Sequence, residues 1–120
     1  MRIELSDSHK ALITSFLGCD KEPDRISILS SDGTKINPDE WDQERLILGM
    51  DSKRTVYVLS YDEADKTFLA LIGDEKEADV KITFRTYMRL VSVNGINIDE
   101  EGREFSIPLG MNGIAILINQ

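Results

Sequence analysis

The sequence predicts an α+β fold that is mainly antiparallel β, with a sandwich-like or half-barrel sheet of six to eight strands and one or two short helices. Two observations predict it. Segments of alternating apolar and polar residues recur from residue 55 onward, and turn residues separate them at hairpin spacing, which favours antiparallel neighbours. With 120 residues and 41% hydrophobic content, the chain is expected to form a single domain, 1–120, around one core.

Residues 6 to 18 have the pattern of a short amphipathic helix. Ser6 or Asp7 can cap its first amides, and Gly18 suits the position after its last turn. The apolar stripe consists of Leu12, Ile13, Phe16 and Leu17. This segment supplies the helical part of the predicted fold.

The stretch from residue 25 to residue 49 leaves one choice open. Residues 25–30 predict a strand, and a turn at 31–33 leads into a second strand at 34–36. Asn37 is a favoured N-cap and precedes Pro38, so a helix with Gly49 as its stop is one interpretation. The other is that residues 45–48 already form a strand after a single helical turn.

The middle of the chain predicts a hairpin and a long strand. Residues 55–61 and 67–72 are rich in β-branched and aromatic residues, and the loop 62–66 joins them. Residues 80–90 alternate, which predicts one buried face and one wet face. The predicted buried face contains Val80, Ile82, Phe84, Thr86, Met88 and Leu90. The opposite face carries a basic stripe of Lys81, Arg85 and Arg89, which acidic neighbours are expected to neutralise.

The alternation slips by one residue at Leu90 and Val91, which predicts a bulge or bend there. Asn94-Gly95 follows and predicts a two-residue type I′ hairpin. The predicted facing pairs are Val93 with Ile96 and Val91 with Ile98. A further strand is predicted beyond the hairpin by the alternating residues Phe105, Ile107 and Leu109, and Pro108 indicates an edge or an end of this strand. Residues 110–113 predict a turn, and residues 114–118 predict a central strand.

No arrangement of residues predicts catalysis, a metal centre or a cofactor. His9 and Cys19 are the only residues of their kinds, which is too few for a typical zinc ligand set, and no phosphate-binding glycine motif occurs. The acidic segments do not have the spacing of an EF-hand loop. We therefore expect a protein that is not an enzyme, with no metal and no cofactor.

Acidic residues dominate the predicted loops. The 22 Asp and Glu outnumber the 14 Lys and Arg, giving a net charge of −8, and 18 of them fall in five runs. The runs are Asp20/Glu22/Asp24, Asp39/Glu40/Asp42/Glu44, Asp62/Glu63/Asp65, Asp74/Glu75/Glu77/Asp79 and Asp99/Glu100/Glu101/Glu104. Such a surface repels nucleic acid and anionic lipid and attracts basic proteins.

The expected function is therefore that of a small acidic protein-binding inhibitor, most economically an immunity or antitoxin-type protein that neutralises a basic toxin nuclease. The alternative is a non-catalytic structural or accessory β domain, such as a phage or secretion-system component. The predicted partner-binding residues are Trp41, Asp39, Glu40, Asp42, Glu44, Asp74, Glu75, Glu77, Asp79, Asp99, Glu100 and Glu101. A single Cys and the lack of a long apolar run favour a cytoplasmic location without direct contact to nucleic acid or membrane.

Overall fold

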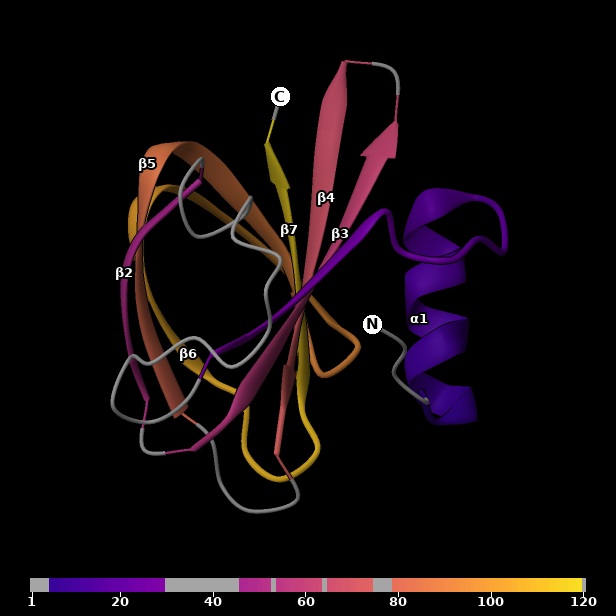
Figure 1. Ribbon diagram of the computed structural model, residues 1–120, viewed down its shortest axis with the longest axis horizontal. Helices are drawn as coiled ribbons and strands as arrows, with labels where there is room; N and C mark the ends of the chain where they lie inside the picture. The colour runs from indigo at the N-terminus through magenta and orange to yellow at the C-terminus, as the bar shows by residue number, and fades with distance from the viewer. Residues whose placement is uncertain (1–4, 30–45, 53, 64, 75–78, 120) are drawn as a thin grey trace.

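The computed structural model describes residues 5–29, 46–52, 54–63, 65–74 and 79–119 (Figure 1). These residues contain one α-helix and seven strands, which confirms the predicted mainly antiparallel α+β class. The elements are α1 Asp7–Leu17, β1 Arg25–Leu29, β2 Ile47–Ser52, β3 Val56–Glu63, β4 Lys66–Gly73, β5 Asp79–Val93, β6 Ile96–Pro108 and β7 Ile114–Asn119.

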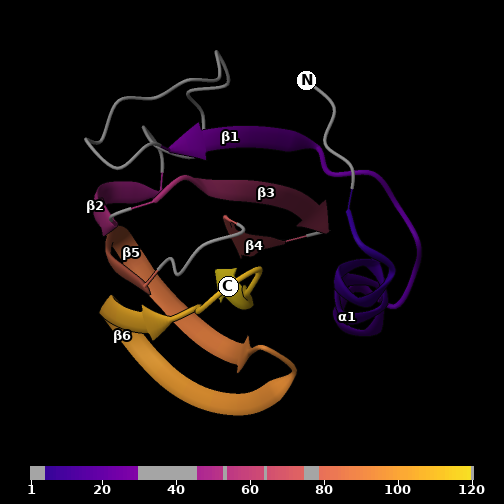
Figure 2. The same ribbon diagram turned by 90° about the horizontal axis from the view of Figure 1, so that it is seen from below.

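The strands form one curled sheet in the order β1-β3-β4-β7-β5-β2, and β6 pairs with β5 outside this path. β5 is the longest strand and has neighbours on both edges. Along one edge of β5, its first residues pair with β2 and its last residues pair with β7. β6 pairs along the other edge of β5. Seen from below, the sheet curls into a half-barrel with β6 at its outer margin and α1 beside β3 (Figure 2).

The sheet has a hydrophobic cluster on each face. The interior cluster fills the curl with side chains that include Val58, Leu71, Ile82, Phe84 and Leu117. The helix-side cluster joins Ile13 of α1 to the outer face of the sheet. β7 contributes to both clusters because alternate residues of a strand point to opposite faces, and this confirms its predicted central position.

The predicted helix and its caps are confirmed. The Ser6 side chain accepts a hydrogen bond from the amide of His9, and Gly18 closes the helix with a φ of 82°. A residue with a side chain would be strained at that φ, which accounts for the glycine. Because Ser6 and Gly18 satisfy groups that the helix itself leaves unpaired, they fix both ends of α1.

β5 bends at two places, of which the sequence predicts one. Its pairing with both β6 and β7 shifts between Leu90 and Ser92, so Val91 joins the helix-side cluster while Leu90 and Val93 stay in the interior one. This is the predicted bulge. A second register shift between Thr83 and Met88 is not signalled by the sequence, because the alternation continues through it.

The Asn94-Gly95 turn has the predicted type I′ geometry, since both residues have positive φ, 51° and 80°. Val93 pairs with Ile96 as predicted. The prediction that Val91 and Ile98 share a face is wrong, because the bulge turns Val91 toward α1 while Ile98 packs against the interior cluster.

Two further predictions are corrected. Residues 47–52 form β2, so the helix interpretation that ended at Gly49 is wrong for this part of the chain, and the strand alternative is right for Ile47 and Leu48. The connection between β3 and β4 is shorter than the predicted loop 62–66, because Glu63 pairs with Lys66. The predicted turn at 31–33, strand at 34–36 and helix start at 37–38 lie outside the described residues.

Candidate functional site

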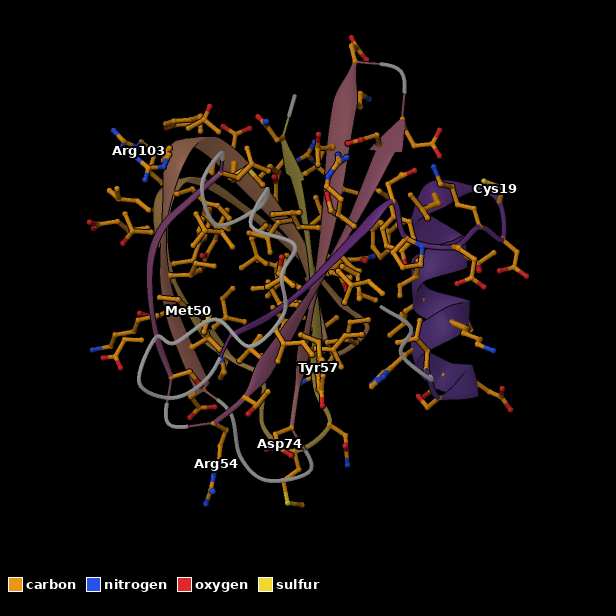
Figure 3. The ribbon with its side chains drawn as sticks, in the orientation of Figure 1. Cys19, Met50, Arg54, Tyr57, Asp74 and Arg103 are labelled. Atoms are coloured by element: carbon orange, nitrogen blue, oxygen red, sulfur yellow. The ribbon has the colours of Figure 1, made fainter. Side chains whose placement is uncertain are left out.

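The structure describes five of the predicted partner-binding residues, and it places them in two separate groups. Asp79 begins β5 opposite Pro108, whereas Glu101 lies opposite Arg89 near the other end of that strand. In Figure 3, Asp74 lies at the lower edge of the molecule, and Arg103, which follows Glu101 on β6, lies at the upper left. The remaining predicted residues lie outside the described part of the chain: Asp39, Glu40, Trp41, Asp42, Glu44, Glu75 and Glu77.

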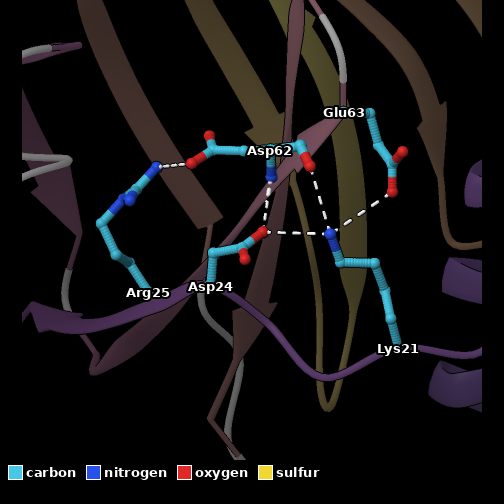
Figure 4. Close-up of polar contacts among 5 residues, drawn as sticks. All are labelled: Lys21, Asp24, Arg25, Asp62 and Glu63. Atoms are coloured by element: carbon cyan, nitrogen blue, oxygen red, sulfur yellow. Dashed lines mark hydrogen bonds and ion pairs between the residues drawn. The ribbon is translucent and has the colours of Figure 1, made fainter.

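Two other acidic runs meet in an ion network that belongs to the fold (Figure 4). Lys21 Nζ lies 3.2 Å from Asp24 Oδ2 and 3.4 Å from Glu63 Oε1, and it donates to the carbonyl oxygen of Asp62 at 3.1 Å. Asp24 Oδ2 also accepts the backbone N–H of Asp62 at 2.7 Å, and Arg25 forms an ion pair with the Asp62 carboxylate. The network joins the segment before β1 to the end of β3.

The electrostatics of this network follow from its contacts. The backbone N–H of Asp62, followed by Lys21, lowers the pKa of Asp24. The Asp24 carboxylate raises the pKa of Lys21. The neighbouring Tyr61 side chain is buried, and loss of solvent raises its pKa to about 12, helped by nearby carboxylates. The carboxylates of Asp24, Asp62 and Glu63 therefore stabilise the fold through their cationic partners and are less available to another protein.

Asp74 and Asp79 lie beside the turn between β6 and β7. The carbonyl oxygen of Asp74 accepts the amide of Asn112 at 2.9 Å, and Asp79 Oδ1 accepts the amide of Gly110 at 3.4 Å. Both acids thus help to position the turn, whose Met111 side chain is exposed. Asp79 also lines a groove of 660 Å³ together with Asp51, Ser52, Val80, Lys81, Ser106, Ile107 and Pro108.

β6 carries more exposed carboxylates than any other described strand. Asp99, Glu100, Glu101 and Glu104 are all exposed on this strand. Asp99 Oδ1 accepts a hydrogen bond from Arg89 Nε at 2.9 Å, so one member of the basic stripe on β5 is neutralised as predicted. Among the described residues, the three glutamates form no ion pair.

The bend in β5 is stabilised from β6. Arg103 Nε donates to the carbonyl oxygen of Phe84 at 3.1 Å, and the amide of Arg85 donates to the carbonyl oxygen of Leu46 at 2.7 Å. Tyr87 is exposed at this bend. The sequence does not reveal these contacts, because Arg103 looks like any exposed basic residue in an acidic strand.

His9 and Cys19 lie at the two ends of α1. His9 Nε2 lies 2.7 Å from the carbonyl oxygen of Asn112, and because a carbonyl can only accept, Nε2 carries the proton. Cys19 is exposed just beyond the end of α1 (Figure 3). In the described ranges, no three or more His, Cys, Asp and Glu side chains gather in a way that would hold a metal ion.

The chain matches no protein-family model, no curated protein and no solved structure. The one helix within the described ranges is too short to cross a membrane. The surface itself is therefore the basis for a functional interpretation, and within it β6 combines the most exposed carboxylates with the outer margin of the sheet.

Proposed function

We propose that this protein is a small, non-catalytic, acidic binding protein that neutralises a basic protein partner, and that its described binding surface is β6. One observation carries the proposal: Glu100, Glu101 and Glu104 are exposed on one strand and, among the described residues, have no cationic partner. Carboxylates that the fold does not pair keep their full attraction for a basic surface.

An immunity or antitoxin-type inhibitor of a toxin nuclease is the most economical biological form of this function. A nuclease presents a basic groove to its substrate phosphates, and a row of carboxylates is complementary to such a groove. Neutralisation needs binding alone, which agrees with a chain whose sequence predicts no catalytic group. A cytoplasmic location is part of this proposal.

The alternative, a structural or accessory β domain, is favoured by a different observation. The carboxylates of Asp24, Asp62 and Glu63 pair with Lys21 and Arg25, so part of the acidic charge serves the fold. If the acids of β6 serve only solubility, they can be replaced without loss of any binding activity. The experiment below separates the two functions.

The test begins with isolation of the partner from the source cell and compares two charge-reversed variants of equal net charge. Glu100→Lys/Glu101→Lys/Glu104→Lys alters β6, and Asp20→Lys/Glu22→Lys/Asp65→Lys alters exposed acids elsewhere. Both variants lose the same long-range attraction, so they should associate more slowly, and more so below an ionic strength of about 0.15 M. Only the β6 variant should lose binding by tenfold or more, roughly 1.4 kcal/mol. Equal affinity of the two variants would exclude β6 as the binding surface.

Two additional variants examine the rest of the proposal. His9→Ala/Cys19→Ser should bind and neutralise the partner as the wild type does, because neither residue has partners in the sequence that make it a nucleophile or a metal ligand. Loss of neutralisation in a folded variant would favour an enzyme. Trp41→Ala should cost about 2 kcal/mol in affinity if residues 39–44 add an aromatic anchor to the surface. For the immunity form, expression of the protein should protect cells from a toxin nuclease encoded beside its gene.

A further inference from the structure

The outer edge of β6 is unpaired in the described structure. β6 forms its ladder with β5 alone, and β2 and β7 lie along the opposite edge of β5, out of reach. Figure 2 shows β6 at the margin of the curled sheet. Backbone groups along a strand point alternately to its two sides, so half of those in β6 face outward and can pair with another strand.

Carboxylates lie on both faces of β6 beside this edge, within residues 96–101. Glu101 is opposite Arg89, and Arg89 also contacts Asp99, so these two acids share the outer face. Glu100 is opposite Leu90, which belongs to the interior cluster, so Glu100 lies on the other face and is exposed at the rim. An added strand would therefore meet negative charge on both of its faces.

The pairing segment has a defined end. Gly102 has a φ of 155°, and the ladder with β5 changes register next to it, where Met88 pairs with Gly102 and Thr83 with Glu104. The ladder with β5 also shifts register by one residue between Asn97 and Glu100, but side chains along β6 keep alternating between its faces up to Glu101, and the larger irregularity follows Gly102. A short extended segment of a partner fits this length.

The carboxylates beside the edge of β6 determine which kind of strand can pair with it. A second copy of this chain, pairing edge to edge, would place Asp99, Glu100 and Glu101 against the same residues of its neighbour, and like charges on facing strands are destabilising. A basic strand has the opposite sign. Two Lys or Arg at positions i and i+2 would face Asp99 and Glu101, and one at i+1 would face Glu100.

We propose that the outer edge of Ile96–Glu101 in β6 binds an extended Lys/Arg-rich segment of the partner as an additional antiparallel strand. Backbone hydrogen bonds along the edge supply affinity, and the carboxylates of Glu100 and Glu101, together with Asp99, which Arg89 already pairs, select consecutive basic residues. The inference rests on the proposed function, because it specifies how the basic partner is held. It adds that the partner contributes its backbone as well as its charge.

The test uses a synthetic peptide of about seven residues with three consecutive lysines flanked by Val and Thr, which favour extended structure. Two further peptides carry the same side chains, and in each one a different set of alternate amides is N-methylated. Strand addition uses only one of these sets, so one methylated peptide should bind about tenfold more weakly than the parent and the other should not. Backbone amides of residues 96–101 should exchange more slowly with solvent when the parent peptide is bound.

A matched pair of protein variants completes the test. Glu100→Gln/Glu101→Gln should weaken binding of the parent peptide by severalfold, whereas Asp20→Asn/Glu22→Asn, with the same change in charge, should not. The inference is overturned if both methylated peptides bind as tightly as the parent peptide, or if protection from hydrogen exchange appears outside β6. It is also overturned if the parent peptide does not bind at a concentration of about 1 mM. A different result would contradict the proposed function: the native partner would bind Glu100→Lys/Glu101→Lys/Glu104→Lys as tightly as it binds the wild type.

Discussion

Asn94 should contribute more to stability than a turn residue ordinarily does. Besides adopting a φ of 51°, it donates from Nδ2 to the carbonyl oxygen of Leu109 at 3.0 Å and accepts the amide of Ile114 at Oδ1 at 2.8 Å. Its own amide donates to the carbonyl oxygen of Ile114 at 2.8 Å. The residue therefore connects the turn between β5 and β6 to the end of β6 and the start of β7.

Substitutions at Asn94 separate the hydrogen bonds from the backbone conformation. Asn94→Gly keeps the turn geometry but leaves the Ile114 amide and the Leu109 carbonyl without this partner, and both residues are buried. Leaving a buried polar group unsatisfied costs about 1–3 kcal/mol, so a loss of about 2–6 kcal/mol is expected for the two groups together. Asn94→Ala adds the cost of a left-handed conformation, about 1 kcal/mol. Asn94→Asp retains the acceptor for Ile114 and should fall between the wild type and the Gly variant.

The measurement is chemical denaturation of the four proteins at neutral pH, with the slope of the transition compared to confirm a common unfolding reaction. The free energy of unfolding is expected to decrease from the wild type to Asn94→Asp, then to Asn94→Gly and then to Asn94→Ala. If Asn94→Gly has the same free energy of unfolding as the wild type, the side-chain hydrogen bonds do not contribute to stability and Asn94 acts only through the turn conformation. If Asn94→Ala and Asn94→Gly have the same free energy of unfolding, the positive φ of Asn94 is not maintained in solution.

Two further predictions concern the turns and the ion network. Gly113→Ala should destabilise the protein by about 3 kcal/mol or more, because the added methyl would overlap the carbonyl oxygen of Leu109, a backbone atom; Gly49→Ala, in open space, should change stability by about 0.5 kcal/mol or less in the same denaturation assay. Asp24→Asn should lower the melting temperature at pH 7 but not in strong acid. The folded-state pKa of Asp24 is lowered from 3.8, so its contribution is present above that pH and is lost as pH falls further; a melting-temperature difference that is constant from pH 7 to strong acid would contradict this.

The sequence predicts those parts of the fold that depend on neighbouring residues. The capped helix between Ser6 and Gly18 and the Asn94-Gly95 turn are set by local backbone chemistry, so short patterns identify them. The bulge after Leu90 is also predictable, because a slip in alternation must be absorbed somewhere.

What the sequence does not predict depends on contacts between distant segments. β2 forms because Ile47 pairs with β5 and is buried there, and at residues 47–49 this tertiary pairing overrides the predicted helix. The second bend in β5 is held by Arg103, whose partner is a backbone carbonyl on another strand. For the candidate site, the sequence identifies the acids of residues 99–101 and, through Pro108, an edge or end for the strand near residue 107, but not that both belong to one strand at the margin of the sheet.

The location of the acidic residues explains why net charge alone is a poor guide to the binding surface. Asp24, Asp62 and Glu63 have cationic partners in the fold, whereas Glu100, Glu101 and Glu104 have none among the described residues. An exposed strand edge is a hazard for self-association, and charged side chains are the usual protection. The same carboxylates that keep two copies of β6 apart attract a strand of opposite charge. Protection from self-pairing and selection of a basic partner are therefore two consequences of one arrangement, and both require that these glutamates remain unpaired in the free protein.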